Sequence, residues 1–148
     1  PGPIGAACQR DDIALGLIAD GVHVDPTMAV LLQRLAGDQL VLVSDALAPY
    51  GLDDGGHRWD ERALLVKDGT CRLEDGTLAG VTLPLLEGVK RLASWGDNPV
   101  ASIHAATVAP RKVLNSKATF QLMGRPLNEL LRWHWNHETK ILSWQHAD

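Results

Sequence analysis

The sequence predicts an α/β fold built on parallel strands. The hydrophobic pattern alternates between strand-like and helix-like periods along the chain, which is typical of a βαβ architecture. Two apolar runs, at 13–19 and 40–43, are each followed by an ionisable residue, His23 and Asp45 respectively. A strand of a parallel sheet is buried on both faces, so a charged side chain is tolerated only at its end, where water or a ligand reaches it. His23 and Asp45 are therefore the first candidates for a functional site.

The segment between these two strands is expected to be a helix. Residues 26–35 begin with Pro26, which favours the first turn of a helix, and Gly37 follows as its end. Its apolar residues recur on one helical face: Met28, Leu31, Leu32 and Leu35. A right-handed crossover through this helix makes the two strands parallel, so His23 and Asp45 should share one end of the sheet.

The middle of the chain is expected to hold turns and a hairpin. Residues 50–57 are rich in glycine and aspartate, and they predict a long loop. Apolar runs at 63–67 and 70–73 are separated by an Asp-Gly pair, which predicts a β-hairpin with a type I′ turn. Residues 74–76 predict a further turn.

The last part of the chain is expected to hold two helices and a hairpin. Residues 83–95 predict an amphipathic helix, and 99–114 a second one that Pro110 should kink or end. The residues expected to face inward from the first of these helices are Leu85, Leu86, Val89, Leu92 and Ala93. Runs at 130–135 and 140–144 flank a turn, and they predict a terminal hairpin.

Composition narrows the class of protein. The chain has 148 residues, 45% of them hydrophobic and 22% charged, with a net charge of −4, as expected of a soluble globular domain. No basic surface for a nucleic acid is expected, and no apolar run approaches the ~20 residues that span a bilayer. Cys8 and Cys71 form neither a metal-type pair nor a disulfide framework, which favours reduced thiols and a cytoplasmic location. Because the chain starts at Pro1 and is shorter than the ~250 residues of a (β/α)8 barrel, we expect it to derive from a longer protein.

Four segments together resemble one enzyme family. They read DGVHVD at 20–25, VSDALAP at 43–49, DGTLAG at 75–80 and ATVAP at 106–110. In this order and spacing they are similar to the C-terminal part of the N-acetylglucosamine-6-phosphate deacetylases, which belong to the amidohydrolase superfamily. The resemblance covers residues 1–115, whereas 116–148 match only loosely.

The resemblance implies a fold and an activity. Residues 1–115 would be the C-terminal portion of a (β/α)8 TIM-type barrel, and 116–148 the terminal β segment of a small β-domain. The family hydrolyses N-acetylglucosamine 6-phosphate to glucosamine 6-phosphate and acetate with a divalent metal, zinc or iron. Its metal ligands and a phosphate-binding arginine lie upstream of this chain, so no metal is expected in the fragment alone. The implied partners are the amino-sugar phosphate, the missing N-terminal part of the barrel and, in the full-length family, a second copy in a homodimer.

The resemblance also assigns roles to residues. Asp45 matches the family's catalytic acid, which takes a proton from metal-bound water and delivers it to the departing amine. His23 matches a substrate-contacting histidine, which could meet a sugar hydroxyl, a phosphate oxygen or the amide carbonyl. The residues expected to bind substrate are Asp20, Gly21, Val22 and His23, together with Leu78, Ala79, Gly80 and Val81 from a loop. Val81 departs from the small polar residue that is usual in the family at that position.

Other interpretations stay open. Without the resemblance, Asp45 reads as a turn aspartate and His23 as a structural histidine. The histidines near the C-terminus (His134, His137 and His146) lack the spacing of metal ligands on a helix, and we interpret them as solvated surface residues. The chain could instead be a catalytically silent domain that binds a sugar phosphate or packs against a partner. It could also belong to an amidohydrolase with a different substrate.

Overall fold

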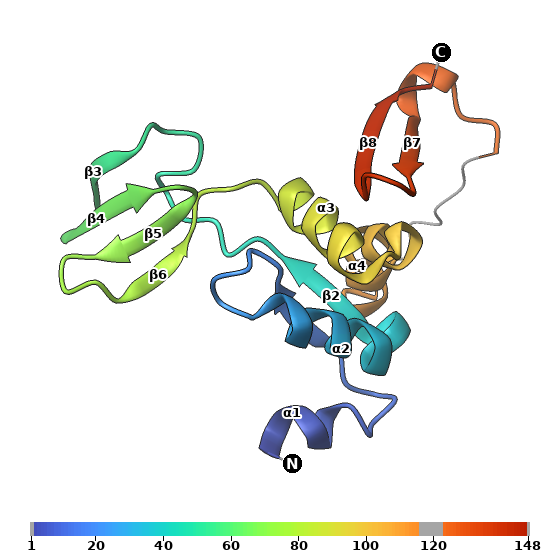
Figure 1. The fold of residues 1–148 in the computed structure, drawn as a ribbon, viewed down its shortest axis with the longest axis horizontal. Coiled ribbons are helices and arrows are strands. Elements are labelled where there is room, and N and C mark those ends of the chain that lie inside the picture. Colours follow the sequence, from blue (N-terminus) through green and yellow to red (C-terminus); the bar gives the residue numbers. More distant parts are fainter. Residues whose placement is uncertain (1, 116–122, 148) are drawn as a thin grey trace.

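A computed structural model describes residues 2–115 and 123–147, and it has the predicted α/β class (Figure 1). Strand β1 (Leu15–Ile18) and strand β2 (Leu40–Val43) are parallel, with Leu15 opposite Leu40, and helix α2 (Pro26–Ala36) connects them. The predicted βαβ unit is confirmed. The carboxyl ends of β1 and β2 therefore lie at the same edge of the sheet.

Helix α2 begins and ends where the sequence indicates. The Asp25 side chain accepts a hydrogen bond from the Thr27 amide at 2.8 Å, and Pro26 occupies the first turn, where a missing N–H costs nothing. Gly37 closes the helix with a φ of +52°, and its N–H donates to the Gln33 carbonyl. A short 3-10 turn, η1 (Gly37–Gln39), then leads into β2.

The apolar face predicted for α2 is mostly exposed. Met28, Leu31 and Leu35 are 49%, 42% and 66% exposed, and of the predicted set only Leu32 packs against the core. The buried residues of the helix are Ala29, Gln33 and Ala36. Small alanines allow a close approach to the neighbouring helices. The polar Gln33 is tolerated in that contact because its Nε2 donates to Ser102 Oγ at 2.9 Å. The larger apolar stripe of α2 is left facing outward in this chain.

An antiparallel sheet of four strands follows β2 in the sequence. In order across the sheet, its strands are β3 (Gly55–Trp59), β4 (Arg62–Lys67), β5 (Thr70–Leu73) and β6 (Leu78–Val81). The predicted hairpin is confirmed as β4–β5, with Asp68 and Gly69 at φ +52° and +78°, as a type I′ turn requires. Figure 1 shows this sheet set apart from the helices.

Two segments predicted as loops belong to this sheet. Residues 55–57 lie in β3, and Leu78, Ala79 and Gly80 lie in β6 with Val81. The consecutive glycines at 55 and 56 have low strand propensity, yet they pair with Val66 and Leu65 of β4. In both β3 and β6, pairing with a neighbouring strand outweighs the low strand propensity of the glycines.

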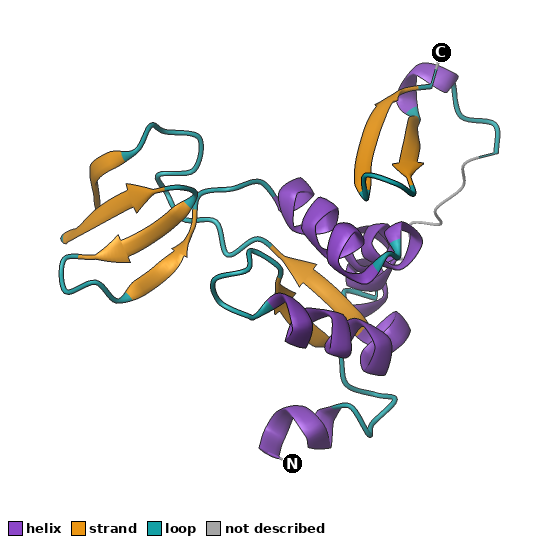
Figure 2. Ribbon diagram, viewed as in Figure 1, coloured by secondary structure: helices purple, strands orange, loops and turns teal. Residues whose placement is uncertain are grey.

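Helices α3 (Leu85–Gly96) and α4 (Pro99–Val113) pack against each other, and α4 covers β2 (Figure 2). Val89, Leu92 and Ala93 are buried, as predicted, while Leu85 and Leu86 are only half-buried. Asn98 caps α4 by accepting a hydrogen bond from the Ala101 amide. Pro110 does not end α4, which continues to Val113.

The chain closes with the predicted hairpin. Strands β7 (Leu131–Asn136) and β8 (Ile141–His146) are antiparallel, after a short 3-10 turn, η2 (Leu127–Glu129). The hairpin packs against the core cluster of helices and strands β1 and β2 through Trp133, Trp135 and Leu142.

Part of the predicted 116–148 segment, namely 116–122 and residue 148, lies outside the described residues. The N-terminal helix α1 (Gly2–Ala7) was not predicted. Within the described residues, no helix is both long enough and apolar enough to cross a bilayer.

Candidate functional site

The two ionisable residues singled out by the sequence lie together. His23 follows β1, Asp45 follows β2, and His23 Nε2 lies 3.5 Å from Asp45 Oδ2. Their proximity results from the parallel pairing of β1 and β2, because the carboxyl ends of parallel strands meet at one edge. The Asp45 side chain is 40% exposed and that of His23 is 20% exposed, so both are within reach of a ligand.

The Asp20 carboxylate holds His23 from the other side. Asp20 Oδ2 lies 2.7 Å from His23 Nδ1, and Asp20 Oδ1 accepts hydrogen bonds at 2.9 Å from the backbone amides of Val22 and His23. The side chain of Asp20 is only 6% exposed. Burial by itself raises the pKa of the Asp20 carboxyl, but the hydrogen bonds from the His23 ring and the two amides outweigh it, so this pKa is lower than usual.

The lowered pKa of Asp20 predicts that the free energy of unfolding depends on pH. The unfolded chain has an aspartate pKa near ~3.9, and the folded value is lower, so the stabilisation is complete above ~3.9 and is lost as the pH falls through the folded value. We expect the free energy of unfolding, measured with urea at several pH values, to decrease below about pH 4. The substitution Asp20→Asn should make this decrease shallower. An equally steep decrease in the variant would show that Asp20 is not responsible for it.

Asp45 has an unusual backbone conformation, which β6 holds in place. Its φ is +54°, in the left-handed region that non-glycine residues rarely adopt, although aspartate tolerates it better than most. The Val81 amide donates to the Asp45 carbonyl at 2.9 Å, and the Leu47 amide donates to the Val81 carbonyl at 3.0 Å. The edge of the antiparallel sheet thus holds the backbone of Asp45 in this conformation.

Close contact between Gly80 and this turn predicts a sensitive position. A Cβ added at Gly80 would lie 2.8 Å from the Asp45 carbonyl oxygen and 2.7 Å from Leu47 Cγ. We expect Gly80→Ala to lower the free energy of unfolding of this chain by about 1–3 kcal/mol, because the turn must shift. The matched control is Gly16→Ala in β1, where nothing lies within 4 Å of the new Cβ and little change is expected. Equal stabilities of the two variants, measured by urea unfolding, would contradict the tight contact.

The other predicted binding residues are placed in two groups. Gly21 turns the chain after β1 with a φ of +77°, and Val22 is 46% exposed beside His23. In β6, Gly80 and Val81 are buried next to Asp45, whereas Leu78 and Ala79 are half-buried further along the strand. The structure therefore brings His23 from the first group, and Gly80 and Val81 from the second, next to Asp45.

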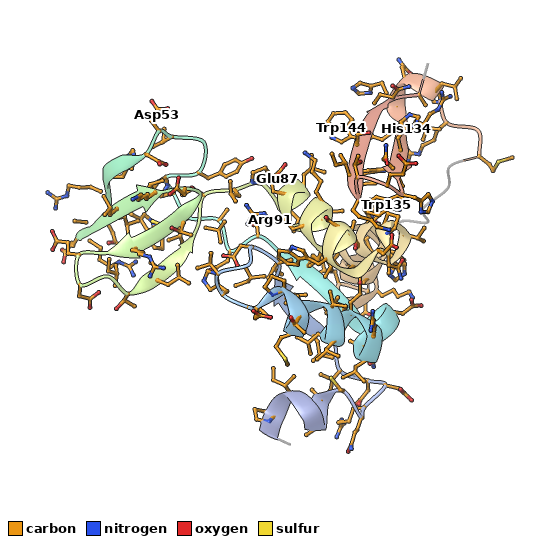
Figure 3. The ribbon with its side chains drawn as sticks, viewed as in Figure 1. Asp53, Glu87, Arg91, His134, Trp135 and Trp144 are labelled. Carbon is orange, nitrogen blue, oxygen red and sulfur yellow. The ribbon has the colours of Figure 1, made fainter. Side chains whose placement is uncertain are left out.

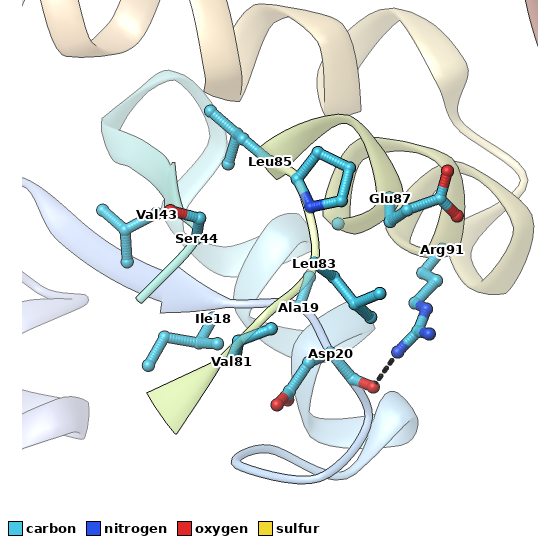
Figure 4. A pocket seen from close by; sticks show the side chains of 12 residues that line it. Ile18, Ala19, Asp20, Val43, Ser44, Val81, Leu83, Leu85, Glu87 and Arg91 are labelled. Carbon is cyan, nitrogen blue, oxygen red and sulfur yellow. Dashed lines mark hydrogen bonds between the residues drawn. The ribbon is translucent and has the colours of Figure 1, made fainter. Parts of the chain in front are cut away.

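A small pocket opens behind these residues, between the strand ends and α3 (Figure 4). Its wall includes Asp20, Ser44 and Val81 from the strand side, and Glu87 and Arg91 from α3. A guanidinium nitrogen of Arg91 donates a hydrogen bond to the Asp20 carbonyl, drawn as a dashed line.

Arg91 was missed by the sequence analysis, which considered only the apolar face of this helix. Figure 3 shows Glu87 and Arg91 together on α3. A single arginine on the polar face of a helix gives no sequence signal that distinguishes it from a solvated charge.

The described residues do not form a metal site by themselves. In 2–115 and 123–147, no group of three or more histidine, cysteine, aspartate or glutamate side chains is arranged to hold an ion. Among the histidines of the hairpin, His137 and His146 stack edge-on against Trp135 and Trp144. The donor set seen here thus does not fit the divalent metal that the resemblance implies.

Comparison with known sequences gives one group of relatives. No family model matches the sequence. The chain is 35% identical over 100 residues to the N-acetylglucosamine-6-phosphate deacetylase of Vibrio furnissii, which covers 68% of this chain and 25% of that protein. It is 33% identical over 115 residues to a candidate N-acetylgalactosamine-6-phosphate deacetylase of Escherichia coli K12, which covers 77% of this chain and 69% of that protein. The chain thus spans a quarter of the first relative and over two thirds of the second.

Solved structures give the same group. N-acetylglucosamine-6-phosphate deacetylase from Pasteurella multocida matches with a TM-score of 0.74 and 25% identity, over 96% of this chain and 39% of that one. A mutant of the Mycobacterium smegmatis enzyme, in complex with N-acetyl-D-glucosamine 6-phosphate, matches with a TM-score of 0.72 and 26% identity. That match covers 78% of this chain and 32% of the other.

Proposed function

The chain belongs to the family of N-acetylglucosamine-6-phosphate and N-acetylgalactosamine-6-phosphate deacetylases, and on this premise we propose that it is the C-terminal part of such an enzyme. The reaction is hydrolysis of the acetamide of N-acetylglucosamine 6-phosphate to acetate and glucosamine 6-phosphate. The observation that carries the proposal is the meeting of His23 and Asp45 at the ends of β1 and β2. Both residues stand in segments that resemble the family's own.

In the proposed reaction, Asp45 moves the proton. A water oxygen bonds to the acetamide carbon while the Asp45 carboxylate takes a proton from that water. The carbon–nitrogen bond then breaks, and Asp45 returns the proton to the departing amine, so the carboxylate is regenerated. The backbone hydrogen bonds with β6 support this role, because they hold residue 45 at the ends of the two strands, beside His23.

We assign substrate binding to the residues around Asp45. Gly21, Val22 and His23 would contact the sugar phosphate from the β1 side, and the segment from Leu78 to Val81 would offer backbone groups. Asp20 belongs to the same site, where we expect it to contribute backbone groups, because its carboxylate is already hydrogen-bonded to His23 and two amides.

His23→Asn is expected to act mainly on KM. Because His23 contacts the ligand before the chemical step, its loss should raise KM of the full-length enzyme more than it lowers kcat. Asparagine retains hydrogen-bonding capacity but not the reach of an imidazole. Steady-state kinetics with N-acetylglucosamine 6-phosphate measure both constants. A loss confined to kcat would assign His23 to the chemical step instead.

We further propose that the rest of the enzyme supplies what these residues lack. Residues 1–115 would be the C-terminal portion of a (β/α)8 barrel, with the sheet of β3–β6 inserted between β2 and α3, and 116–148 would belong to a small β-domain. The exposed Met28, Leu31 and Leu35 of α2 support a covering partner, which would be the preceding part of the barrel. The divalent metal, zinc or iron, would be held by that part. A homodimer and a cytoplasmic location, consistent with the free Cys8 and Cys71, complete the proposal.

The experiment that tests the proposed function is acetate release by the full-length enzyme. Three substrates are compared: N-acetylglucosamine 6-phosphate, its galactosamine epimer and unphosphorylated N-acetylglucosamine. We expect N-acetylglucosamine 6-phosphate to yield acetate and free amine in equal amounts, and the unphosphorylated sugar to yield much less of both. Preference for the epimer would favour the second candidate, an N-acetylgalactosamine-6-phosphate deacetylase, which the relative from Escherichia coli K12 supports. Binding without acetate release would show a silent sugar-phosphate-binding domain and refute the proposal.

A further inference from the structure

The Asp20–His23 contact determines which atom of the histidine ring faces the site. His23 has two ring nitrogens, and the structure gives them different neighbours: Nδ1 lies 2.7 Å from Asp20 Oδ2, and Nε2 lies 3.5 Å from Asp45 Oδ2. Asp20 is buried, whereas Asp45 is partly exposed. The two nitrogens therefore have unequal roles: Nδ1 faces the buried Asp20, and Nε2 faces the partly exposed Asp45.

The proton on Nδ1 follows from the chemistry of Asp20. The pKa of the Asp20 carboxyl is lower than usual, so near neutral pH the group is an ionised carboxylate that can only accept hydrogen bonds. A contact of 2.7 Å between an acceptor and Nδ1 requires Nδ1 to donate. In neutral imidazole only one nitrogen carries a proton, so Nε2 is left with its lone pair.

We propose that Asp20 is a positioning residue, whose carboxylate keeps the His23 proton on Nδ1 and thereby presents Nε2 as the atom that meets the substrate. This inference rests on the proposed function for the identity of the ligand. A ring that carries its single proton on Nδ1 accepts a hydrogen bond at Nε2, and a hydroxyl group of the sugar can donate that bond. A fully ionised phosphate oxygen or an amide carbonyl has no proton to give, so either one needs a ring that is protonated at Nε2 as well.

Two features hold Asp20 in place for this role. Its second oxygen binds the amides of Val22 and His23, which fixes the carboxylate plane against the turn. Arg91 of α3 donates to the Asp20 carbonyl, which ties the end of β1 to the helix. His23 is thus oriented through Asp20 from two directions, much as second carboxylates orient histidines in other sites.

The test is the tautomer of His23 in this chain, read from long-range proton–nitrogen NMR spectra of ¹⁵N-histidine-labelled protein above the pH at which the ring is charged. We expect Nδ1 to carry the proton. In Asp20→Asn, the amide oxygen can still accept from the two backbone amides, while its NH₂ group faces Nδ1. Because a donor then faces Nδ1, we expect the proton to move to Nε2.

The matched control is Asp25→Asn, since Asp25 caps α2 through the Thr27 amide and makes no described hydrogen bond to His23. It should leave the His23 tautomer unchanged. A proton on Nε2 in the unmodified chain would overturn the proposal, even if Asp20→Asn fails to fold. A proton that stays on Nδ1 in a folded Asp20→Asn chain would overturn it as well. The readout needs no substrate, so its failure is distinguishable from failure of the acetate-release assay.

Discussion

Replacing Asp45 by asparagine should lower kcat of the full-length enzyme by a factor on the order of 10² to 10⁴, because the carboxylate that we propose to accept and return the proton is lost. Asparagine has nearly the same size as aspartate. It also tolerates the left-handed φ of +54° at this position, so the turn after β2 should keep its shape. KM should change much less than kcat, since the exchange removes chemistry and not volume.

Asp25→Asn is the control for this experiment. It makes the same chemical exchange two residues after His23, and asparagine remains a good helix cap, so kcat should stay near its original value. If Asp45→Asn retains a kcat close to that of the unmodified enzyme, Asp45 is only a turn aspartate. The catalytic assignment would then be wrong.

The second large effect is expected in the core, at Leu92. This side chain is 0% exposed on α3, in the cluster that joins the helices to β1 and β2. Leu92→Ala should lower the free energy of unfolding of this chain by about 2–5 kcal/mol, because the lost contacts leave a cavity. Urea unfolding followed by circular dichroism measures the change.

Leu35→Ala makes the matching exchange at a side chain that is 66% exposed on α2. Its effect in this chain should stay within about 0.5 kcal/mol. A cost at Leu35 as large as that at Leu92 would show that another part of the chain, or a second copy, covers the outer face of α2 in solution.

The sequence was most informative where local signals agree with the fold. The runs at 40–43 and 63–67 and the Asp-Gly pair at 68–69 each carry strand or turn chemistry of their own, and these elements form as predicted. Strands β3 and β6 were missed because their glycines oppose strand formation. They exist through pairing with β4 and β5, which no single segment encodes.

The same distinction applies to the candidate site. The proximity of His23 and Asp45 could be predicted, because parallel strands joined by a right-handed crossover bring their ends together. The contact of the Asp20 carboxylate with His23 and the contact of Arg91 with the Asp20 carbonyl could not be predicted. Both depend on side-chain directions across a turn and between distant segments, and a sequence pattern does not contain these.

The most direct test of the central claim is a crystal structure of the full-length Asp45→Asn enzyme with N-acetylglucosamine 6-phosphate bound. We predict that the acetamide group of the ligand lies within hydrogen-bond distance of the residue 45 side chain, with His23 Nε2 in contact with the same ligand. A sugar phosphate bound away from the ends of β1 and β2, with residue 45 facing only solvent, would contradict the account.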